Sequence, residues 1–282
     1  DTYVKKIIAR KSILAHILIN TIDEFRGMKK EDVACLSEGE VFVSKVPVDP
    51  GHTNKPGDTI RREKITEKIG GLNTEDNEIN EGMIRYDIIF YVRMKDGISQ
   101  IIVNTELQKD EPTEYKIINR GTFYVCRMIS SQKDREFYNM DYDKIKQIYS
   151  IWICMNAKED CLSHIHFIQE DIVNSGQWKG NLDLLNLLMI SLTNEPPPRE
   201  EKYELHRLLG ALLSSKLSAD EKLEIVKEYD IVVDNIMREE VGAMSSLAQG
   251  IFEKGIEEGR DKGRMEGWKK GRMEGRAEAV YS

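Results

Sequence analysis

The chain has few of the features that mark secreted, zinc-ribbon or membrane proteins. Its 4 cysteines lie far apart with no C-x-x-C pair, which argues against a zinc ribbon and favours reduced thiols. No apolar run approaches the roughly 18 residues of a membrane-spanning helix. The first residues also lack the apolar segment of a signal peptide. These absences predict a cytoplasmic protein without membrane contact.

Familiar nucleotide-binding and hydrolase motifs are missing as well. The segment 51–59 contains Gly, Lys and Thr but not the G-x-x-x-x-G-K-[ST] spacing of a phosphate-binding loop. Neither a G-x-S-x-G elbow nor a G-x-G-x-x-G fingerprint occurs. His164 and His166 have no third ligand nearby in sequence, so we interpret them as surface or core histidines.

The net charge of -8 is unevenly distributed. Residues 136–250 hold 11 Lys/Arg against 20 Asp/Glu, whereas residues 1–135 hold 22 of each. An acidic chain does not coat nucleic acid by charge alone, but the neutral first part leaves room for a local basic groove. Charge therefore neither requires nor excludes a nucleic-acid substrate.

Hydrophobic periodicity predicts the elements of the first half. Apolar residues recur at helical spacing over 7–25, and a strand is expected at 40–48 before a long loop. Residues 84–94 and 98–107 are rich in β-branched and aromatic side chains, and the Asp-Gly between them is a strong hairpin signal. A helix is expected at 114–131.

The second half begins with expected strands at 149–155 and 162–168 and an expected helix at 172–192. Three consecutive prolines then interrupt the chain, which favours an extended linker. Beyond them, Ser218 and Glu221 form a capping-box signature at the start of a helix. We therefore divide the chain into an α/β domain at 1–193, a small helical subdomain at 199–241 and a charged helical tail at 242–282.

Glycine recurs every four residues in the tail, interleaved with Glu, Arg and Lys. The positions are Gly255, Gly259, Gly263, Gly267, Gly271 and Gly275. This spacing places small residues along one side of a helix, where a second helix could approach closely. Each Gly costs about 1 kcal/mol relative to Ala, so the helix is marginal without a partner. Two alternatives stay open, a homo-oligomer formed through the tail and a solvated tail.

The expected hairpin fixes which residues face one another. With Asp96 and Gly97 as the loop, the numbers of every cross-strand pair sum to 193, so Asp87 faces Glu106. Their Cβ atoms would lie about 5 Å apart, where like charges repel. Mg²⁺ would offset the repulsion and activate a water for attack on a phosphodiester. The alternative is an exposed strand face whose basic neighbours screen two ordinary acids.

Alternation along both strands predicts one buried face and one polar face. The face expected to be buried carries Tyr86, Ile88, Phe90, Val92, Ile101, Val103, Thr105 and Leu107. The polar face carries Arg85, Asp87, Asn104, Glu106 and Gln108.

An ordered set of short motifs runs through most of the chain. The motifs are 12–25, 69–82, Asp87, Glu106-Leu107-Gln108, a helix with Tyr115, Arg120, Tyr124 and Arg127, and the Glu-Gly-Arg tail. In this order they resemble the recombination-promoting nuclease and putative transposase family, a branch of the PD-(D/E)XK nuclease superfamily. The resemblance implies an α-β-β-β-α-β, restriction-endonuclease-like core with a mixed sheet flanked by helices, and DNA cleavage with Mg²⁺.

The resemblance also assigns roles to single residues. Asp87 matches the D, Glu106 the (D/E) and Gln108 the K of the superfamily pattern, with the two acids as metal ligands. Some superfamily members add an acid from the first helix, for which Glu24 is chosen ahead of Asp23. Gln can orient water or offer its carbonyl oxygen to the metal, but it supplies no positive charge.

Three further residues share one face of the helix that follows the hairpin. Arg120, Tyr124 and Arg127 are spaced by four and three residues and could contact DNA phosphates. Alternatively, Tyr124 belongs to the core and Arg120 pairs with Glu106 or Asp87. The resemblance thus implies a DNA endonuclease using Mg²⁺ or Mn²⁺. The alternative is an inactive DNA-binding or oligomerisation module with the same fold.

Overall fold

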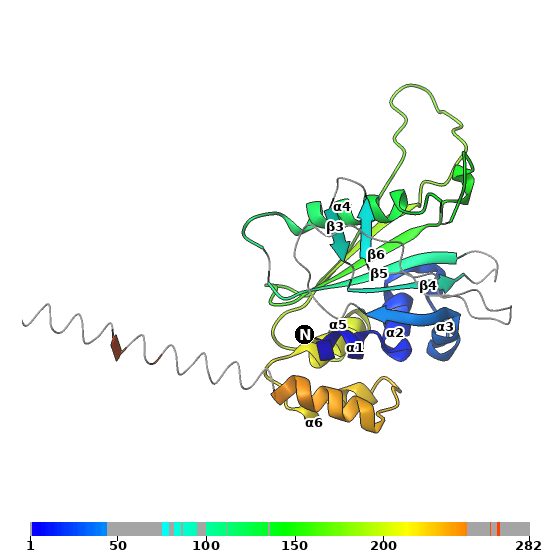
Figure 1. Cartoon of the computed structure of the whole chain (residues 1–282). Coiled ribbons are helices and arrows are strands. Elements are labelled where there is room, and N and C mark those ends of the chain that lie inside the picture. The colour runs from blue at the N-terminus through cyan, green and yellow to red at the C-terminus, as the bar shows by residue number, and fades with distance from the viewer. Residues whose placement is uncertain are drawn as a thin grey trace, which may run out of the picture.

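The computed structural model contains, within the residues that it describes, a six-stranded sheet with helices on both faces (Figure 1). The described residues are 2–43, 75–78, 82–85, 87–94, 100–110, 112–134, 136–246, 260 and 264–265. The chain is therefore an α/β protein, as expected. In this part of the chain, no helix combines the length and apolar character needed to cross a membrane.

The central sheet is mixed. Its strands in spatial order are β1 (Ser37–Val43), β4 (Ile88–Arg93), β5 (Gln100–Gln108), β6 (Ile148–Cys154), β8 (Leu185–Ser191) and β7 (Cys161–His166). The first three strands are antiparallel, β5, β6 and β8 are parallel, and β7 is antiparallel to β8. A separate antiparallel pair is formed by β2 (Glu75–Glu78) and β3 (Gly82–Arg85).

Helix α4 (Ile117–Ser130) is the crossover between the parallel strands β5 and β6, and it covers one face of the sheet (Figure 1). Val125 and Met128 of the helix are buried in the same cluster as Trp152 and Leu187 of the sheet. The helix lies close to the sheet at Gly121, where an added Cβ would be 2.9 Å from Leu187 Cδ1. Glycine therefore allows α4 to approach the side chain of Leu187 closely.

The other face of the sheet is covered by helices from both ends of the chain (Figure 1). They are α1 (Thr2–Ile8), α2 (Lys11–Thr21), the 3-10 helix η1 (Asp23–Phe25), α3 (Lys30–Leu36) and α5 (Glu204–Leu213). Helix α6 (Ala219–Lys227) packs against α5, farther from the sheet (Figure 1). The short 3-10 helices η2 (Tyr142–Lys144) and η3 (Glu201–Tyr203) lie in the connections before β6 and α5.

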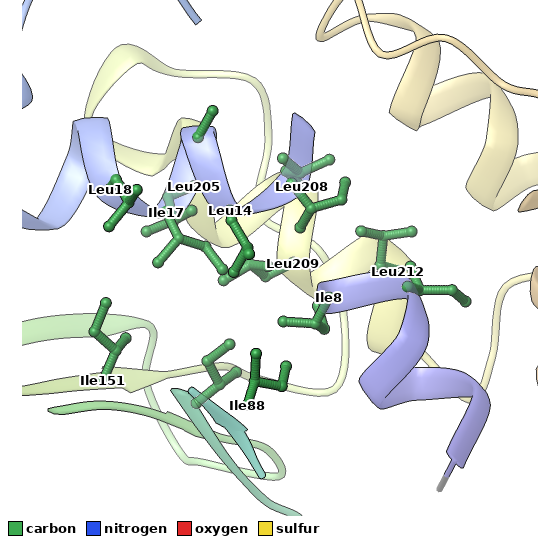
Figure 2. Packing of buried hydrophobic residues seen from close by; sticks show 14 of the residues in the cluster. Ile8, Leu14, Ile17, Leu18, Ile88, Ile151, Leu205, Leu208, Leu209 and Leu212 are labelled. Atoms are coloured by element: carbon green, nitrogen blue, oxygen red, sulfur yellow. The ribbon is translucent and has the colours of Figure 1, made fainter. Parts of the chain in front are cut away.

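Figure 2 shows the large core on this face, with side chains of α2 and α5 meeting above Ile88 and Ile151 of the sheet. Leu14 and Ile17 of α2 and Leu209 of α5 are all buried in this cluster. The helices α5 and α6 share this core, so the expected boundary after residue 193 does not separate two cores. The capping box of α6 at Ser218 is confirmed.

The expected hairpin register is confirmed in every described pair. Ile88 pairs with Thr105 and Arg93 with Gln100, so each pair of numbers sums to 193. The turn residues Asp96 and Gly97 lie outside the described residues. Tyr86, the loop 51–63 and the six tail glycines also lie outside them.

Three expectations about single elements were wrong or incomplete, and one helix was not expected. The helix expected at 172–192 is wrong, because residues 185–191 form β8, a mostly apolar strand that is buried on both faces. Such a run does not distinguish a buried strand from a buried helix. The single first helix is divided into α1 and α2, and α3 was not expected. The strand expected at 84–94 is interrupted, with a bend at Asp87.

The polar face of the hairpin is not a solvent-exposed surface. This excludes the alternative of an exposed strand face whose basic neighbours screen two ordinary acids. Helix α4 covers it, and Asn104 and Glu106 are only 0% and 4% exposed. Both faces of β5 are therefore buried, and its polar side chains need partners inside the protein.

Candidate active site around Asp87 and Glu106

Asp87 and Glu106 are held together by reciprocal hydrogen bonds. The main-chain N–H of Asp87 donates to Glu106 Oε1 at 3.1 Å, and the main-chain N–H of Leu107 donates to Asp87 Oδ2 at 2.9 Å. Asp87 lies in the bend just before β4, where the regular ladder with β5 begins at Ile88. Side-chain oxygens thus extend the pairing of the two strands by one position, and they fix both carboxyl groups.

Burial makes Glu106 an unusual acid. Its side chain lies beneath α4 at the end of β5, and its pKa is raised from 4.5 to about 8. Loss of hydration is the main cause, and the negative charge of Asp87 adds to it. The hydrogen bond from Asp87 N–H and the charge of Arg120 act in the opposite direction but do not balance the burial. Glu106 is therefore mostly protonated at neutral pH when no metal is bound.

Lys5 is a member of this site that the sequence did not reveal. Its Nζ lies 2.6 Å from Asp87 Oδ1, and the two side chains are only 16% and 18% exposed. The residue comes from α1, far from Asp87 in sequence. No motif or periodic pattern links positions 5 and 87, so only the folded chain shows the contact.

Arg120 lies over the aromatic rings behind the acids. Its guanidinium carbon is 5.0 Å from the ring centre of Tyr124 and 5.4 Å from that of Trp152. It donates to the hydroxyls of Tyr115 and Tyr124, at 2.9 Å each. A third contact, at 3.5 Å, reaches Gln108 Oε1. These contacts favour a structural role for Arg120 over a freely exposed phosphate contact, although its partners are two tyrosines and Gln108 rather than Glu106 or Asp87.

The amide of Gln108 is oriented by two neighbours. Its Nε2 donates to the main-chain oxygen of Asp110 at 2.7 Å, which leaves Oε1 directed toward Arg120. Further along the same face of β5, Asn104 donates from Nδ2 to Ser150 Oγ at 3.2 Å. The buried Asn104 Oδ1 has no hydrogen-bond partner among the described residues. The site therefore contains side-chain oxygens besides those of the two acids that could bind a metal ion.

Two of the expected site residues lie elsewhere. Glu24, with Asp23, lies in η1, and their charges contribute to the raised pKa of Tyr149, which burial and Asp183 raise more strongly, to about 12. Tyr149 packs on the α2 side of the sheet, opposite the face of Glu106. Arg127 is only 3% exposed, so its guanidinium is not on the surface as a phosphate contact would require.

The described residues contain no cluster of three or more His, Cys, Asp or Glu side chains placed to hold a metal ion. The acidic group at this site is the pair of Asp87 and Glu106, with Gln108 as a neutral neighbour. Comparisons with protein-family models, curated proteins and solved structures each gave no match. The functional argument therefore depends on the geometry of this site.

Proposed function

We propose that the chain is a Mg²⁺-dependent DNA endonuclease with a PD-(D/E)XK core. The observation that carries the proposal is the fixed pair of Asp87 and Glu106, one of which has its pKa raised to about 8. Two carboxyl groups held this close in a buried position are stable together only if one is protonated or a cation lies between them. Without a metal, the proton on Glu106 meets this condition, and a divalent cation would allow both groups to ionise.

The donor set fits Mg²⁺. This ion takes oxygen ligands and keeps several of its waters, so one or two carboxylates from the protein are sufficient. Asp87 and Glu106 supply them, and Gln108 Oε1 lies on the same face of β5. The unpartnered Asn104 Oδ1 is a further oxygen on this face. Mn²⁺ has similar ligand preferences and is expected to substitute.

The order of elements supports the same proposal. Three antiparallel strands, β1, β4 and β5, follow the N-terminal helices, and the α4 crossover leads to the parallel strand β6. Apart from the separate pair β2 and β3, which lies between β1 and β4 in the chain, this is the α-β-β-β-α-β order implied by the resemblance to the recombination-promoting nucleases. Glu106 lies on β5 and Asp87 in the bend just before β4, so the acids adjoin the central strands of that unit.

Each side chain has a distinct role in the proposed reaction. A bound Mg²⁺ supplies Lewis acidity toward a phosphodiester and lowers the pKa of a coordinated water. Asp87 and Glu106 hold the ion, and main-chain hydrogen bonds keep their carboxylates oriented. Gln108 accepts or donates a hydrogen bond to a water, and Arg120 limits the rotation of its amide.

One observation favours the second candidate, an inactive DNA-binding or oligomerisation module. Lys5 already pairs with Asp87, and Arg120 lowers the pKa of Glu106. Lys5 therefore compensates Asp87 without any metal, while Glu106 keeps its proton despite the charge of Arg120. In that case the acids would serve only to hold α1 and α4 against the sheet.

Cleavage of supercoiled plasmid distinguishes the two candidates. The wild type is compared with Asp87→Asn and Glu106→Gln in Mg²⁺, Mn²⁺ and EDTA. Asp32→Asn, which changes an exposed acid on α3, is the matched control. We expect metal-dependent nicking in the wild type and the control, with a loss of about 100-fold or more in both site variants. Glu24→Gln separately tests the third acid, which the resemblance assigns to the first helix.

Two results would decide against the nuclease. Equal nicking by all variants would show that the activity comes from elsewhere. DNA binding without nicking by the wild type in either metal would favour the inactive module. Thermal melting gives an independent readout, because a metal that binds only the folded state must raise the melting temperature of the wild type more than that of Asp87→Asn.

A further inference from the structure

The candidate site lacks the positive charge that a lysine supplies in the superfamily pattern. Gln108 stands where the superfamily pattern has lysine, and a glutamine side chain cannot stabilise the negative charge that develops during phosphodiester hydrolysis. The site nevertheless contains an ammonium group, because Lys5 Nζ lies 2.6 Å from Asp87 Oδ1. The charge therefore reaches the acids from α1 rather than from β5.

Both oxygens of Asp87 are engaged. Oδ2 accepts from the main-chain N–H of Leu107, and Oδ1 is paired with Lys5. The hydrogen bond to Leu107 belongs to the strand pairing, whereas the contact with Lys5 is a side-chain ion pair on a flexible stem. A divalent cation bound by Asp87 would approach Oδ1 and displace the ammonium group. The stem would still hold that group beside the site, since α1 packs through Ile7 and Ile8.

Arg120, the other cation near the acids, is not free to take this role. Two tyrosine hydroxyls accept from its guanidinium, and the rings of Tyr124 and Trp152 lie on it. Movement toward a substrate would break all of these contacts. Lys5 has to give up only the ion pair that the metal itself would replace.

We infer that Lys5 supplies the positive charge that Gln108 lacks, and that it exchanges between two partners. In the metal-free protein it neutralises Asp87. When the metal occupies Asp87 Oδ1, the released ammonium contacts a non-bridging phosphate oxygen of the DNA and stabilises its developing charge. This inference rests on the proposed nuclease function and deepens it by naming the residue that contacts the phosphate.

The exchange makes an unusual prediction for Lys5→Met, which keeps an apolar stem of similar length. Removing a competing cation should tighten the binding of metal, whereas removing a phosphate contact should slow cleavage. Loss of one electrostatic donor in an active site typically lowers the rate by about 100-fold or more. A residue with only a structural role would not shift metal affinity and cleavage in opposite directions.

Calorimetric titration with Mn²⁺ and plasmid cleavage at saturating Mn²⁺ measure the two effects. The variants are Lys5→Met, Lys5→Arg and the matched control Lys6→Met, whose lysine is exposed and lies over the Tyr3 ring at 5.6 Å. We expect Lys5→Met to bind Mn²⁺ about tenfold more tightly and to cleave about 100-fold more slowly. Lys5→Arg should recover part of the cleavage, and Lys6→Met should match the wild type. Circular dichroism of each variant in EDTA controls for folding.

The possible failures are distinguishable. A wild type that neither binds Mn²⁺ nor cleaves DNA overturns the proposed function, and this inference with it. A wild type that does both, with unchanged Mn²⁺ affinity in Lys5→Met, overturns the exchange alone. Tighter binding with undiminished cleavage also overturns it, because Lys5 would then be only a counter-ion of the metal-free state.

Discussion

Replacing Glu106 by glutamine should stabilise the metal-free protein at alkaline pH. The pKa of the Glu106 carboxyl is raised from 4.5 to about 8 by burial and by the charge of Asp87. Between these values the folded chain keeps a proton that the unfolded chain has lost. Stability therefore falls as the pH rises through this window, and the penalty is complete above about pH 8. Glutamine has a similar shape and does not ionise, so the variant avoids the penalty.

The size of the effect follows from the two pKa values. Each pH unit between the unfolded value of 4.5 and the folded value of about 8 corresponds to about 1.4 kcal/mol. The full penalty is thus on the order of 5 kcal/mol, a large share of the stability of an ordinary domain. Rearrangement of Lys5 or entry of water would reduce it. The difference between Glu106→Gln and the wild type should still widen steadily from acid to alkaline pH.

Urea denaturation in EDTA at about pH 5, 7 and 9 measures this difference. The exposed-acid variant Asp32→Asn again serves as the control, and its curve should run parallel to that of the wild type. Parallel curves for Glu106→Gln and the wild type would refute the reasoning, because they would mean that Glu106 ionises as freely in the folded state as in the unfolded chain. Repeating the series in Mg²⁺ should flatten the wild-type slope, since a bound cation favours the ionised carboxylate.

Other predictions concern packing, capping and a second buried group. Gly121→Ala should lower stability by about 1 to 3 kcal/mol in urea denaturation, because the new Cβ would lie 2.9 Å from Leu187 Cδ1. Gly242→Ala, with open space at its Cβ, should be neutral or stabilising by up to about 1 kcal/mol, and equal effects at both glycines would contradict the close crossing of α4. Ser218→Ala should cost about 1 kcal/mol by removing the cap of α6, and an unchanged thermal melt would argue against that cap. The pKa of His16 is lowered to about 4, chiefly by burial, so stability should fall as the pH drops from about 6.5 toward 4, a loss that His16→Gln should reduce.

The hairpin could be predicted from sequence because its signals are local. The Asp-Gly turn and the alternating side chains of two adjacent segments determine which residues pair, and all described pairs follow the expected sum of 193. The pairing of Asp87 with Glu106 follows from the same count. The hydrogen bonds of this pair could not be predicted from any pattern. Asp87 lies in a bend, and side-chain oxygens of Asp87 and Glu106 accept the main-chain hydrogen bonds that join it to β5.

The other members of the site could not be predicted, because their positions depend on packing between distant segments. Lys5 reaches Asp87 only after α1 has packed on the large core. Strand β8 was mistaken for a helix because a strand buried on both faces has no alternation. Arg127 shares a helix face with Arg120 in a periodic pattern, yet the helix buries it at 3% exposure.

The same packing explains why a strand with polar side chains became the candidate site. Asn104, Glu106 and Gln108 alternate along β5 as if they faced water, but the α4 crossover covers that face. Once covered, each polar group needs a partner, and the sheet supplies Ser150 for Asn104 and main-chain N–H groups for the acids. The protein does not fully stabilise the ionised form of Glu106, as its raised pKa shows. A cation bound beside this buried acid would stabilise its ionised form. Glu106 and its neighbour Asp87 are therefore the first residues to test.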